Sequence, residues 1–307
     1  MTARELAGLV LLAVASVAPA RAATCDHDKA CLEGIADRYR AAYVKHDRSL
    51  APFAARVRYT ENHVGMEFPD GTWDTVTEEL GPAVTLSDTR TGNIGIYTTI
   101  MQNETPGFLA VRLKVQGGRI TEVEHIISTK RNLSSPPTPI GDAKDFRPDP
   151  AMMQPVPVAQ RLPRARLIAH ADGYFSTLQK NDGEIRGTRF SPDALRYENG
   201  MKFPEIEKGF KSGRYAFNER VRDRDYFLVD EERQVVMARG FIDHKGILDE
   251  FKLTDGTPTK SVFREPQTWA FLEAFKIVDD RIVSVQATFI QAPYYMRSPW
   301  TKRPDPR

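Results

Sequence analysis

Residues 58–62 read Arg-Tyr-Thr-Glu-Asn, and residues 196–199 read Arg-Tyr-Glu-Asn, one residue shorter. Further matches flank this pair in the same order and at nearly the same offset. They are Ala-Asp-Arg-Tyr (36–39) with Ala-Asp-Gly-Tyr (171–174), and Gly-Met-Glu-Phe-Pro (65–69) with Gly-Met-Lys-Phe-Pro (200–204). Ordered matches at a nearly constant spacing indicate an internal repeat. The sequence therefore predicts two copies of one domain.

The pattern of apolar residues is the same in both copies. Apolar side chains fall at helical spacing over residues 32–43 and again over 167–178. Three long strands follow in each copy, at about 93–101, 108–116 and 119–129, and at about 234–244, 267–278 and 281–291. Gly117-Gly118 joins two of them as a tight hairpin. We expect an α+β fold of two tandem cone-shaped domains, each a long N-terminal helix on a curved antiparallel sheet around a pocket.

Domain boundaries follow from the composition along the chain. Residues 1–23 combine Arg4, an apolar run and an Ala-Arg-Ala motif, which predicts a signal peptide; a buried N-terminal helix is the alternative. The remaining boundaries are a first cone (24–133), a proline-rich linker (134–163), a second cone (164–300) and a tail (301–307). The second cone carries an insertion at 245–265. A signal peptide predicts a periplasmic or secreted protein.

Charge and cysteine content narrow the classes of partner. The 307 residues include 43 Lys and Arg against 41 Asp and Glu, a net charge of +2, so we expect no nucleic-acid partner. No segment after residue 23 reaches 18 apolar residues, so we expect no membrane span after cleavage. Cys25 and Cys31 fit an oxidising compartment and can pair if Cys25 precedes the first helical turn. We expect that disulfide.

The Arg-Tyr-x-Glu-Asn element and the hairpin Gly-Gly-Arg-Ile-Thr-Glu-Val-Glu at 117–124 resemble the nuclear-transport-factor-2-like (SnoaL-like) superfamily. The chain is most similar to its secreted two-copy members, domains of unknown function in bacteria and fungi. The resemblance implies a cone fold that works without a cofactor, through acid/base residues inside the cone. It leaves the activity open, because this scaffold hosts isomerases, dehydratases, cyclases, lyases and non-catalytic binders. Some relatives remove formaldehyde from lignin-derived dimers.

Common catalytic motifs are absent from the sequence. It contains no Gly-x-Ser-x-Gly elbow, phosphate loop, dinucleotide fingerprint or His-Glu-x-x-His motif. Its six histidines are scattered, so we expect neither a metal site nor a cofactor. Any chemistry must come from side chains that the fold gathers in a pocket.

The first candidate group lies in the repeated element. On a regular strand Tyr59, Glu61 and His63 share one face, and a carboxylate facing an apolar cavity becomes a usable base near neutral pH. The alternative is structural, with Glu61 and Asn62 bonding backbone where the strand turns. The corresponding residues of the second copy are Tyr197, Glu198 and Asn199.

Two histidines are further candidates. His125 lies among aliphatic residues on the last strand of copy one, either as a proton shuttle or as a core histidine. Residues 285–289, the aligned region of copy two, lack a histidine. His244 ends a strand before the insertion, which we expect to act as a lid; Asp243 points to the opposite side.

The predicted site residues and function are as follows. The catalytic candidates are Tyr59, Glu61, His125 and His244. The ligand-binding candidates are Asn62, His63, Trp73, Tyr97, Tyr197, Glu198, Asn199 and Tyr294. The aromatic stretch 293–300 caps a pocket or seals the contact between copies.

We expect an exported, cofactor-independent lyase, isomerase or hydratase acting on a small apolar, aromatic molecule, with a lignin-derived dimer as one candidate. Glu61 or a histidine would be the base, and Tyr59 or Asn62 would bind the oxyanion. The alternative is a non-catalytic binding protein. Either is expected to be a monomer whose two copies form an intrachain pseudo-dimer.

Overall fold

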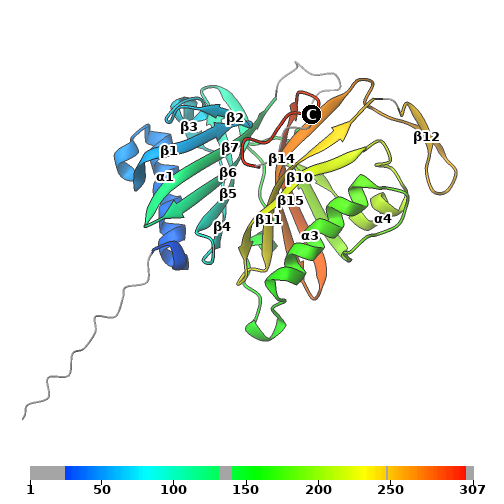
Figure 1. The fold of residues 1–307 in the computed structure, drawn as a ribbon, viewed down its shortest axis with the longest axis horizontal. Coiled ribbons are helices and arrows are strands. Elements are labelled where there is room, and N and C mark those ends of the chain that lie inside the picture. Colours follow the sequence, from blue (N-terminus) through cyan, green and yellow to red (C-terminus); the bar gives the residue numbers. More distant parts are fainter. Residues whose placement is uncertain (1–24, 131–139, 247, 302–307) are drawn as a thin grey trace, which may run out of the picture.

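The computed structural model describes residues 25–130, 140–246 and 248–301. The predicted signal peptide (1–23) lies outside this range, as do residues 131–133 of the predicted first cone, 134–139 of the linker and 302–307 of the tail. The described chain forms two curved sheets with helices, which confirms the expected mixed α and β class (Figure 1).

The first half builds a seven-stranded sheet in the order β2-β1-β7-β6-β5-β3, with β4 also paired to β5. Its elements are α1 (Lys29–Lys45), β1 (Phe53–Glu61), β2 (Val64–Met66), α2 (Thr72–Thr75), β3 (Val76–Glu79), β4 (Val84–Asp88), β5 (Asn93–Gln102), β6 (Thr105–Gln116) and β7 (Arg119–Thr129). The predicted long strands of this half are therefore confirmed to within a few residues.

The second half builds a six-stranded sheet in the order β10-β11-β14-β15-β8-β9, and the insertion forms a separate hairpin of β12 and β13. Its elements are α3 (Arg164–Gln179), β8 (Phe190–Glu198), β9 (Met201–Phe203), α4 (Ile206–Lys211), β10 (Arg220–Asp230), β11 (Val235–His244), β12 (Glu250–Lys252), β13 (Pro258–Lys260), β14 (Gln267–Val278) and β15 (Arg281–Ala292).

Both sheets have the same strand order. The prediction of wholly antiparallel sheets was wrong for both. In each sheet the first long strand runs parallel to the last: β1 beside β7, and β8 beside β15. The intervening strands of each sheet form antiparallel pairs with their neighbours. A long strand at 220–230 was not predicted, because its first half, Arg-Val-Arg-Asp-Arg-Asp, resembles a polar loop. The charged side chains of this strand form ion pairs, for example Arg222 with Asp243 and Asp225 with Arg239.

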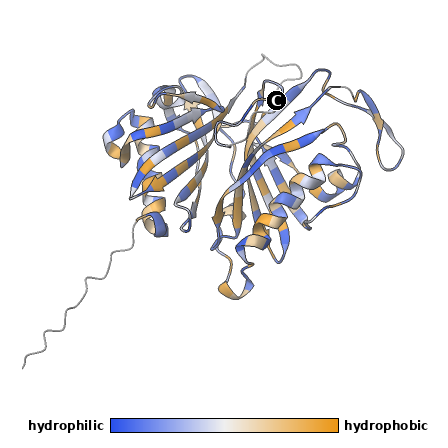
Figure 2. Ribbon diagram, viewed as in Figure 1, coloured by the Kyte–Doolittle hydropathy of each residue, from blue (hydrophilic) through white to orange (hydrophobic). Residues whose placement is uncertain are grey.

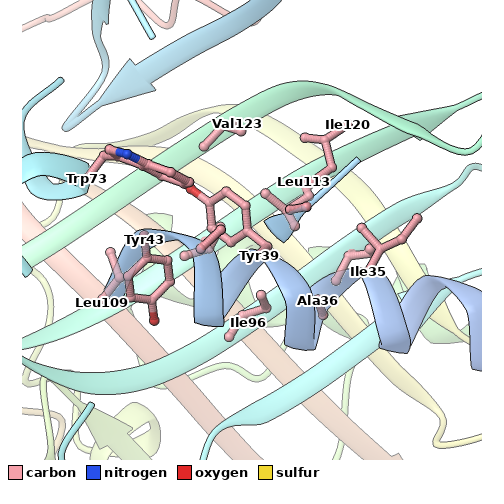
Figure 3. Packing of buried hydrophobic residues seen from close by; sticks show 14 of the residues in the cluster. Ile35, Ala36, Tyr39, Tyr43, Trp73, Ile96, Leu109, Leu113, Ile120 and Val123 are labelled. Atoms are coloured by element: carbon pink, nitrogen blue, oxygen red, sulfur yellow. The ribbon is translucent and has the colours of Figure 1, made fainter. Parts of the chain in front are cut away.

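Each sheet packs a helix on one face. Helix α1 begins where Asp28 accepts a hydrogen bond from the Cys31 amide (2.7 Å), a typical N-cap. Figure 3 shows Ile35, Ala36, Tyr39 and Tyr43 of this helix against the strands. Helix α3 covers the second sheet in the same way with its apolar residues Leu167, Ala171, Tyr174, Phe175 and Leu178. Apolar and polar residues alternate along these elements (Figure 2), as amphipathic packing requires.

The faces opposite the two helices pack against each other. Tyr97, Ala110 and Ile126 of the first sheet meet Met237 and other residues of the second in one buried cluster. The predicted linker contributes to it, because Met152 is fully buried there. The two halves therefore share a continuous apolar contact, and helices α1 and α3 lie on the outer faces of the two sheets.

The strand registers correct the sequence alignment of the two copies. Asn62 and Asn199 occupy equivalent turns: each amide N–H bonds a carbonyl of the last strand, that of His125 or of Ala287. Counting back from these turns places Glu61 with Glu198, but Tyr59 with Arg196. The matching of Tyr59 with Tyr197 was wrong. Aligning the two motifs by residue identity shifts the register of the second copy by one residue before Glu198. The side chains inside the two halves are therefore different.

The expected disulfide is confirmed: Cys25 and Cys31 are joined, with Cα atoms 5.3 Å apart. Next to it, Asp26 accepts hydrogen bonds from the amides of Gly117 and Gly118, at 2.7 Å each. These contacts fasten the start of α1 to the β6–β7 hairpin.

Replacing Cys25 and Cys31 together with serine is expected to lower the free energy of unfolding by about 2 kcal/mol, the chain-entropy value for so short a loop. Urea unfolding curves of the oxidised wild type and the double variant measure the difference. The reduced wild type serves as the control and should match the variant. Equal stability of oxidised and reduced protein would contradict the prediction.

Candidate functional site

A pocket of about 160 Å³ lies in the second half, between the sheet and the residues that precede β10. Its walls are mainly aromatic and aliphatic, with a few ionisable side chains among them. The residues that line it are Tyr174, Leu178, Arg196, Glu198, Tyr215, Phe217, Asn218, Ile242, His244, Phe263, Trp269, Phe271, Glu273, Ala287 and Phe289. An apolar hollow with a few polar groups is the usual form of a small-molecule site.

Two carboxyl groups face each other across one alanine in this pocket. Ala287 of β15 pairs with Glu198 of β8 on one side and with Glu273 of β14 on the other. With neighbouring strands about 4.8 Å apart, the two glutamate backbones are separated by about 10 Å. The methyl group of Ala287 leaves the space between the carboxyl groups open.

Glu273 is buried among aromatic neighbours. Burial raises the pKa of its carboxyl group to about 8, with a smaller contribution from the charge of Glu198, while Arg196 and a hydrogen bond with Tyr174 act in the opposite direction. Glu273 therefore carries its proton at neutral pH.

Glu198, in contrast, is part of an ion pair. Its carboxylate forms an ion pair with Arg196 (Nε to Oε1, 3.0 Å). Arg196 is itself fixed between rings, with its Nη2 donating to the Tyr215 hydroxyl (2.6 Å) and its Nη1 to that of Tyr174 (3.2 Å). One glutamate of the pair is thus protonated and the other charged, an arrangement that marks acid and base roles in enzymes.

His244 occupies another part of the pocket wall. It is 1% exposed, and its ring stacks on Phe263 of the insertion at a centroid distance of 4.1 Å. Burial lowers the pKa of His244 to about 4, so the ring is neutral at pH 7. An adjoining hollow of about 180 Å³ shares a wall with the pocket, formed by Phe217, Asn218, His244 and Phe263. Phe263 of the insertion therefore forms part of the pocket wall.

The first-half candidates form a separate cluster. The Tyr59 hydroxyl donates to Glu61 (2.9 Å) and lies 3.3 Å from His125 Nδ1, and Tyr39, which the sequence analysis missed, lies 2.6 Å from His125 Nε2. Burial alone would raise the pKa of Glu61, but His125 and the donors at Thr72 lower it to about 2. Glu61 is therefore a weak base.

Aromatic side chains fill the interior around that cluster. Trp73 lies beside Tyr39, with ring centroids 5.6 Å apart, and beside Tyr43 (6.4 Å), as Figure 3 shows. His125 occupies the position that Ala287 holds in the second half, because it pairs with both Glu61 and Val111. The larger ring takes up the space that is open in the pocket.

The remaining predicted ligand-binding residues lie elsewhere. Asn62 and Asn199 form hydrogen bonds with the backbone of Ile127 and Phe289. For Asn62 this is the structural role that the sequence analysis gave as the alternative to ligand binding. His63 does not share a face with Glu61, because β1 ends at Glu61 and residues 62 and 63 form a turn with positive φ. Its ring packs instead on Phe241 of the other half (4.7 Å).

Three predicted tyrosines also lie outside the pocket. Tyr97 is buried in the contact between the sheets, and Tyr197 packs on Phe146 because its side chain points away from Glu198. Tyr294, in the stretch 293–300, accepts a hydrogen bond from Arg220 through its hydroxyl group. That stretch seals the contact between the halves: the Trp300 indole donates to Thr60 of the first half (3.1 Å) and stacks near arginines of both halves.

Sequence reasoning missed Tyr174, Arg196 and Glu273. A signal for Glu273 was present, because residues 269, 271, 273 and 275 read Trp, Phe, Glu and Phe on one face of a predicted strand. One carboxyl group among three aromatic residues indicates a desolvated acid. Arg196 was missed because the shifted alignment placed Tyr197, and not Arg196, opposite Tyr59.

The residues that the structure describes contain no group of three or more His, Cys, Asp or Glu side chains placed to hold a metal ion. None of their helices has both the length and the apolar content needed to cross a membrane.

The chain is similar to one family model over part of its length and to several solved structures. The model of a family described as a domain of unknown function, DUF8021, matches residues 160–289. No curated protein matches the chain. AclR of Streptomyces galilaeus, a proposed hydroxylase, is similar in structure, with 18% identity over 43% of this chain and 83% of its own and a TM-score of 0.29.

Two other solved structures are also similar. IdmH of Streptomyces antibioticus, a proposed polyketide cyclase, has 19% identity over 41% of this chain and 91% of its own, with a TM-score of 0.27. An NTF2-like protein of Cytophaga hutchinsonii has 15% identity over 42% and 100%, also with a TM-score of 0.27. At this level of similarity the chemistry of the pocket has to be inferred from its own side chains.

Proposed function

We propose that the second half is a cofactor-independent acid/base enzyme, an isomerase or lyase that acts on a small aromatic carbonyl compound. The observation that carries this proposal is the pair of carboxyl groups on either side of Ala287, one protonated and one charged, in an apolar pocket. Such a pair supplies a proton donor and a proton acceptor at the same pH.

The proton transfers are those of a keto–enol shift. Glu198 removes a proton from the carbon next to the substrate carbonyl, and Glu273 gives its proton to the carbonyl oxygen, which forms an enol. In a substrate with a C=C bond β,γ to the carbonyl this enol is a dienol, so Glu198 can return the proton to the γ carbon while Glu273 recovers the enol proton. The C=C bond then lies α,β to the carbonyl. Where the β carbon bears a leaving group, the enol returns its proton to Glu273 and re-forms the carbonyl as the bond to the leaving group breaks, and the leaving group takes the proton that Glu198 holds.

The pocket favours an aromatic substrate. An apolar cavity of about 150 Å³ accepts one benzene ring, and the volume here is close to that. Trp269, Phe271 and Phe289 supply edges and faces for ring contacts. The ion pair of Glu198 and Arg196 at the wall disfavours a purely aliphatic ligand.

We further propose that the chain is an exported tandem pair of NTF2-like cones, which pair within one monomer. The Cys25–Cys31 disulfide supports an oxidising compartment. The shared strand order and the apolar contact between the sheets support the intrachain pair. Size-exclusion chromatography with light scattering tests the monomer.

Deuterium exchange tests the acid/base proposal without knowledge of the natural substrate. The protein is incubated in D₂O with a set of aromatic ketones, and exchange at the carbon next to the carbonyl is followed by NMR. Catalysed exchange of at least one ketone is expected. Binding without exchange throughout the set would identify the pocket as a non-catalytic binding site.

Glu61→Gln in the first half is expected to leave the exchange rate within about twofold of wild type. It should lower the free energy of unfolding by about 1–3 kcal/mol, because Glu61 accepts buried hydrogen bonds from Tyr59 and Thr72. Exchange rates measured well below the unfolding temperature, together with urea curves, separate the two effects. A large loss of exchange in the folded variant would place the active site in the first half.

A further inference from the structure

His244 is buried at the pocket wall with one ring nitrogen unused. Its Nδ1 lies 3.4 Å from the carbonyl oxygen of Phe217. Its Nε2 has no hydrogen-bond partner among the residues that the structure describes. A buried polar atom without a partner is costly, and in a binding pocket it indicates a contact that the ligand completes.

The hydrogen bond at Nδ1 determines what Nε2 requires. A carbonyl oxygen only accepts, so Nδ1 carries the proton in that bond. In a neutral imidazole the other nitrogen then presents a lone pair. Nε2 of His244 is therefore an acceptor, and the group that satisfies it must donate a hydrogen.

The position of His244 sets where the donor lies on the ligand. In the register of β11 and β14, His244 is opposite Gln267, whereas Glu273 lies six residues further along β14. At about 3.3 Å per residue this separates the two backbones by about 20 Å along a straight strand, less on a curved one. His244 and Glu273 therefore line opposite ends of the same pocket, so that a ligand in contact with both must be elongated.

We infer that His244 selects the substrate by accepting a hydrogen bond from a hydroxyl group on its ring, at the end remote from the carbonyl group held by Glu273 and Glu198. The substrate class is thus a hydroxyaryl ketone or enone whose polar groups lie at opposite ends. The inference rests on the proposed function, because Glu273 fixes the direction of the ligand. The stacked ring of Phe263 holds the imidazole in place.

The test compares a butanone carrying a para-hydroxyphenyl ring with its para-methoxyphenyl analogue, which accepts but cannot donate. Dissociation constants are measured by calorimetry on the whole protein. Wild type is expected to bind the hydroxyl compound about 10- to 100-fold more tightly, since the analogue leaves Nε2 buried and unpaired. Equal affinities would overturn the inference.

Variants assign the preference to His244. His244→Phe keeps the stacked ring but removes Nε2, so the preference should fall to less than about threefold. Glu273→Gln should lose exchange chemistry but retain the preference. A wild type that prefers the hydroxyl compound without exchange refutes the acid/base proposal alone, whereas exchange without preference refutes the role of His244 alone.

A measurement on unmodified protein covers the case in which His244→Phe does not fold. Nitrogen NMR of histidine-labelled protein reports which ring nitrogen carries the proton. The expected spectrum shows His244 protonated at Nδ1, with the Nε2 resonance shifting when the hydroxyl compound binds and not when the methoxyl compound binds. Protonation at Nε2 in the free protein would overturn the inference.

Discussion

Glu273→Gln is expected to lower catalysed deuterium exchange by about 10²- to 10⁴-fold, the usual contribution of a general acid. The amide keeps the shape of the side chain and its place beside Tyr174, but it has no acidic proton to transfer. In wild type, exchange should decline as the pH rises through about 8, where Glu273 loses its proton. Exchange rates from pH 6 to pH 9 measure both effects.

The same variant is expected to be more stable than wild type at alkaline pH. The pKa of Glu273 is raised in the folded protein, so between about pH 4.5 and pH 8 the unfolded chain releases this proton and the native chain does not. Wild type therefore loses stability across that window relative to Glu273→Gln, by about 2–5 kcal/mol at pH 8. Below pH 4.5 the two proteins should converge.

Glu198→Gln is the matched control for this experiment. It should also stop exchange, because the base is lost, yet it should not produce the alkaline gain in stability that Glu273→Gln gives. Full exchange in Glu273→Gln, or a stability difference that does not change with pH, would show that the Glu273 carboxyl group does not hold its proton as proposed.

Glu124→Gln is expected to lower the free energy of unfolding by about 3–5 kcal/mol, the cost of leaving buried charge unpaired. Glu124 is fully buried and binds Arg112 of its own half (2.9 Å) and Arg239 of the other (2.6 Å). Burial would raise its pKa, but the two guanidinium groups together hold the pKa below its usual value. The carboxylate therefore compensates two buried cations at the contact between the halves.

Glu122→Gln provides the comparison, because Glu122 pairs with the same Arg112 (2.8 Å) at a partly exposed position. Its loss should be below about 1 kcal/mol. Replacing the triad Arg112, Glu124 and Arg239 with Met, Leu and Met should recover most of the stability. Equal losses in the two single variants, measured by urea unfolding, would contradict a special role for the buried site.

The sequence predicted the architecture better than the site, for a physical reason. Period-two patterns and the Gly117-Gly118 turn locate the long strands, because burial on one face leaves a regular record in the sequence. A register error of one residue moves a side chain to the opposite face. That error put Tyr197 in the pocket, where the structure has Arg196.

Which half contains an open pocket depends on a pair of positions that no local pattern marks. His125 fills the interior of the first half, and Ala287 leaves the second half open. A histidine attracts attention as a catalytic candidate, whereas an alanine does not. The pocket is therefore found only when the side chains of three neighbouring strands are placed together, which requires the register.

The parallel pairing of first and last strands governs how each half can form. Tyr59 pairs with Val123 and Arg196 with Val285, so each sheet joins segments from its two sequence extremes. Contacts between distant segments make folding slow, because a long chain loop must close before they form. During synthesis, β1 and β8 can pair at once with β2 and β9, but the edge of each that joins β7 or β15 stays open until that strand emerges. A protein arrested before β7 or β15 would therefore expose an open strand edge that is prone to aggregation.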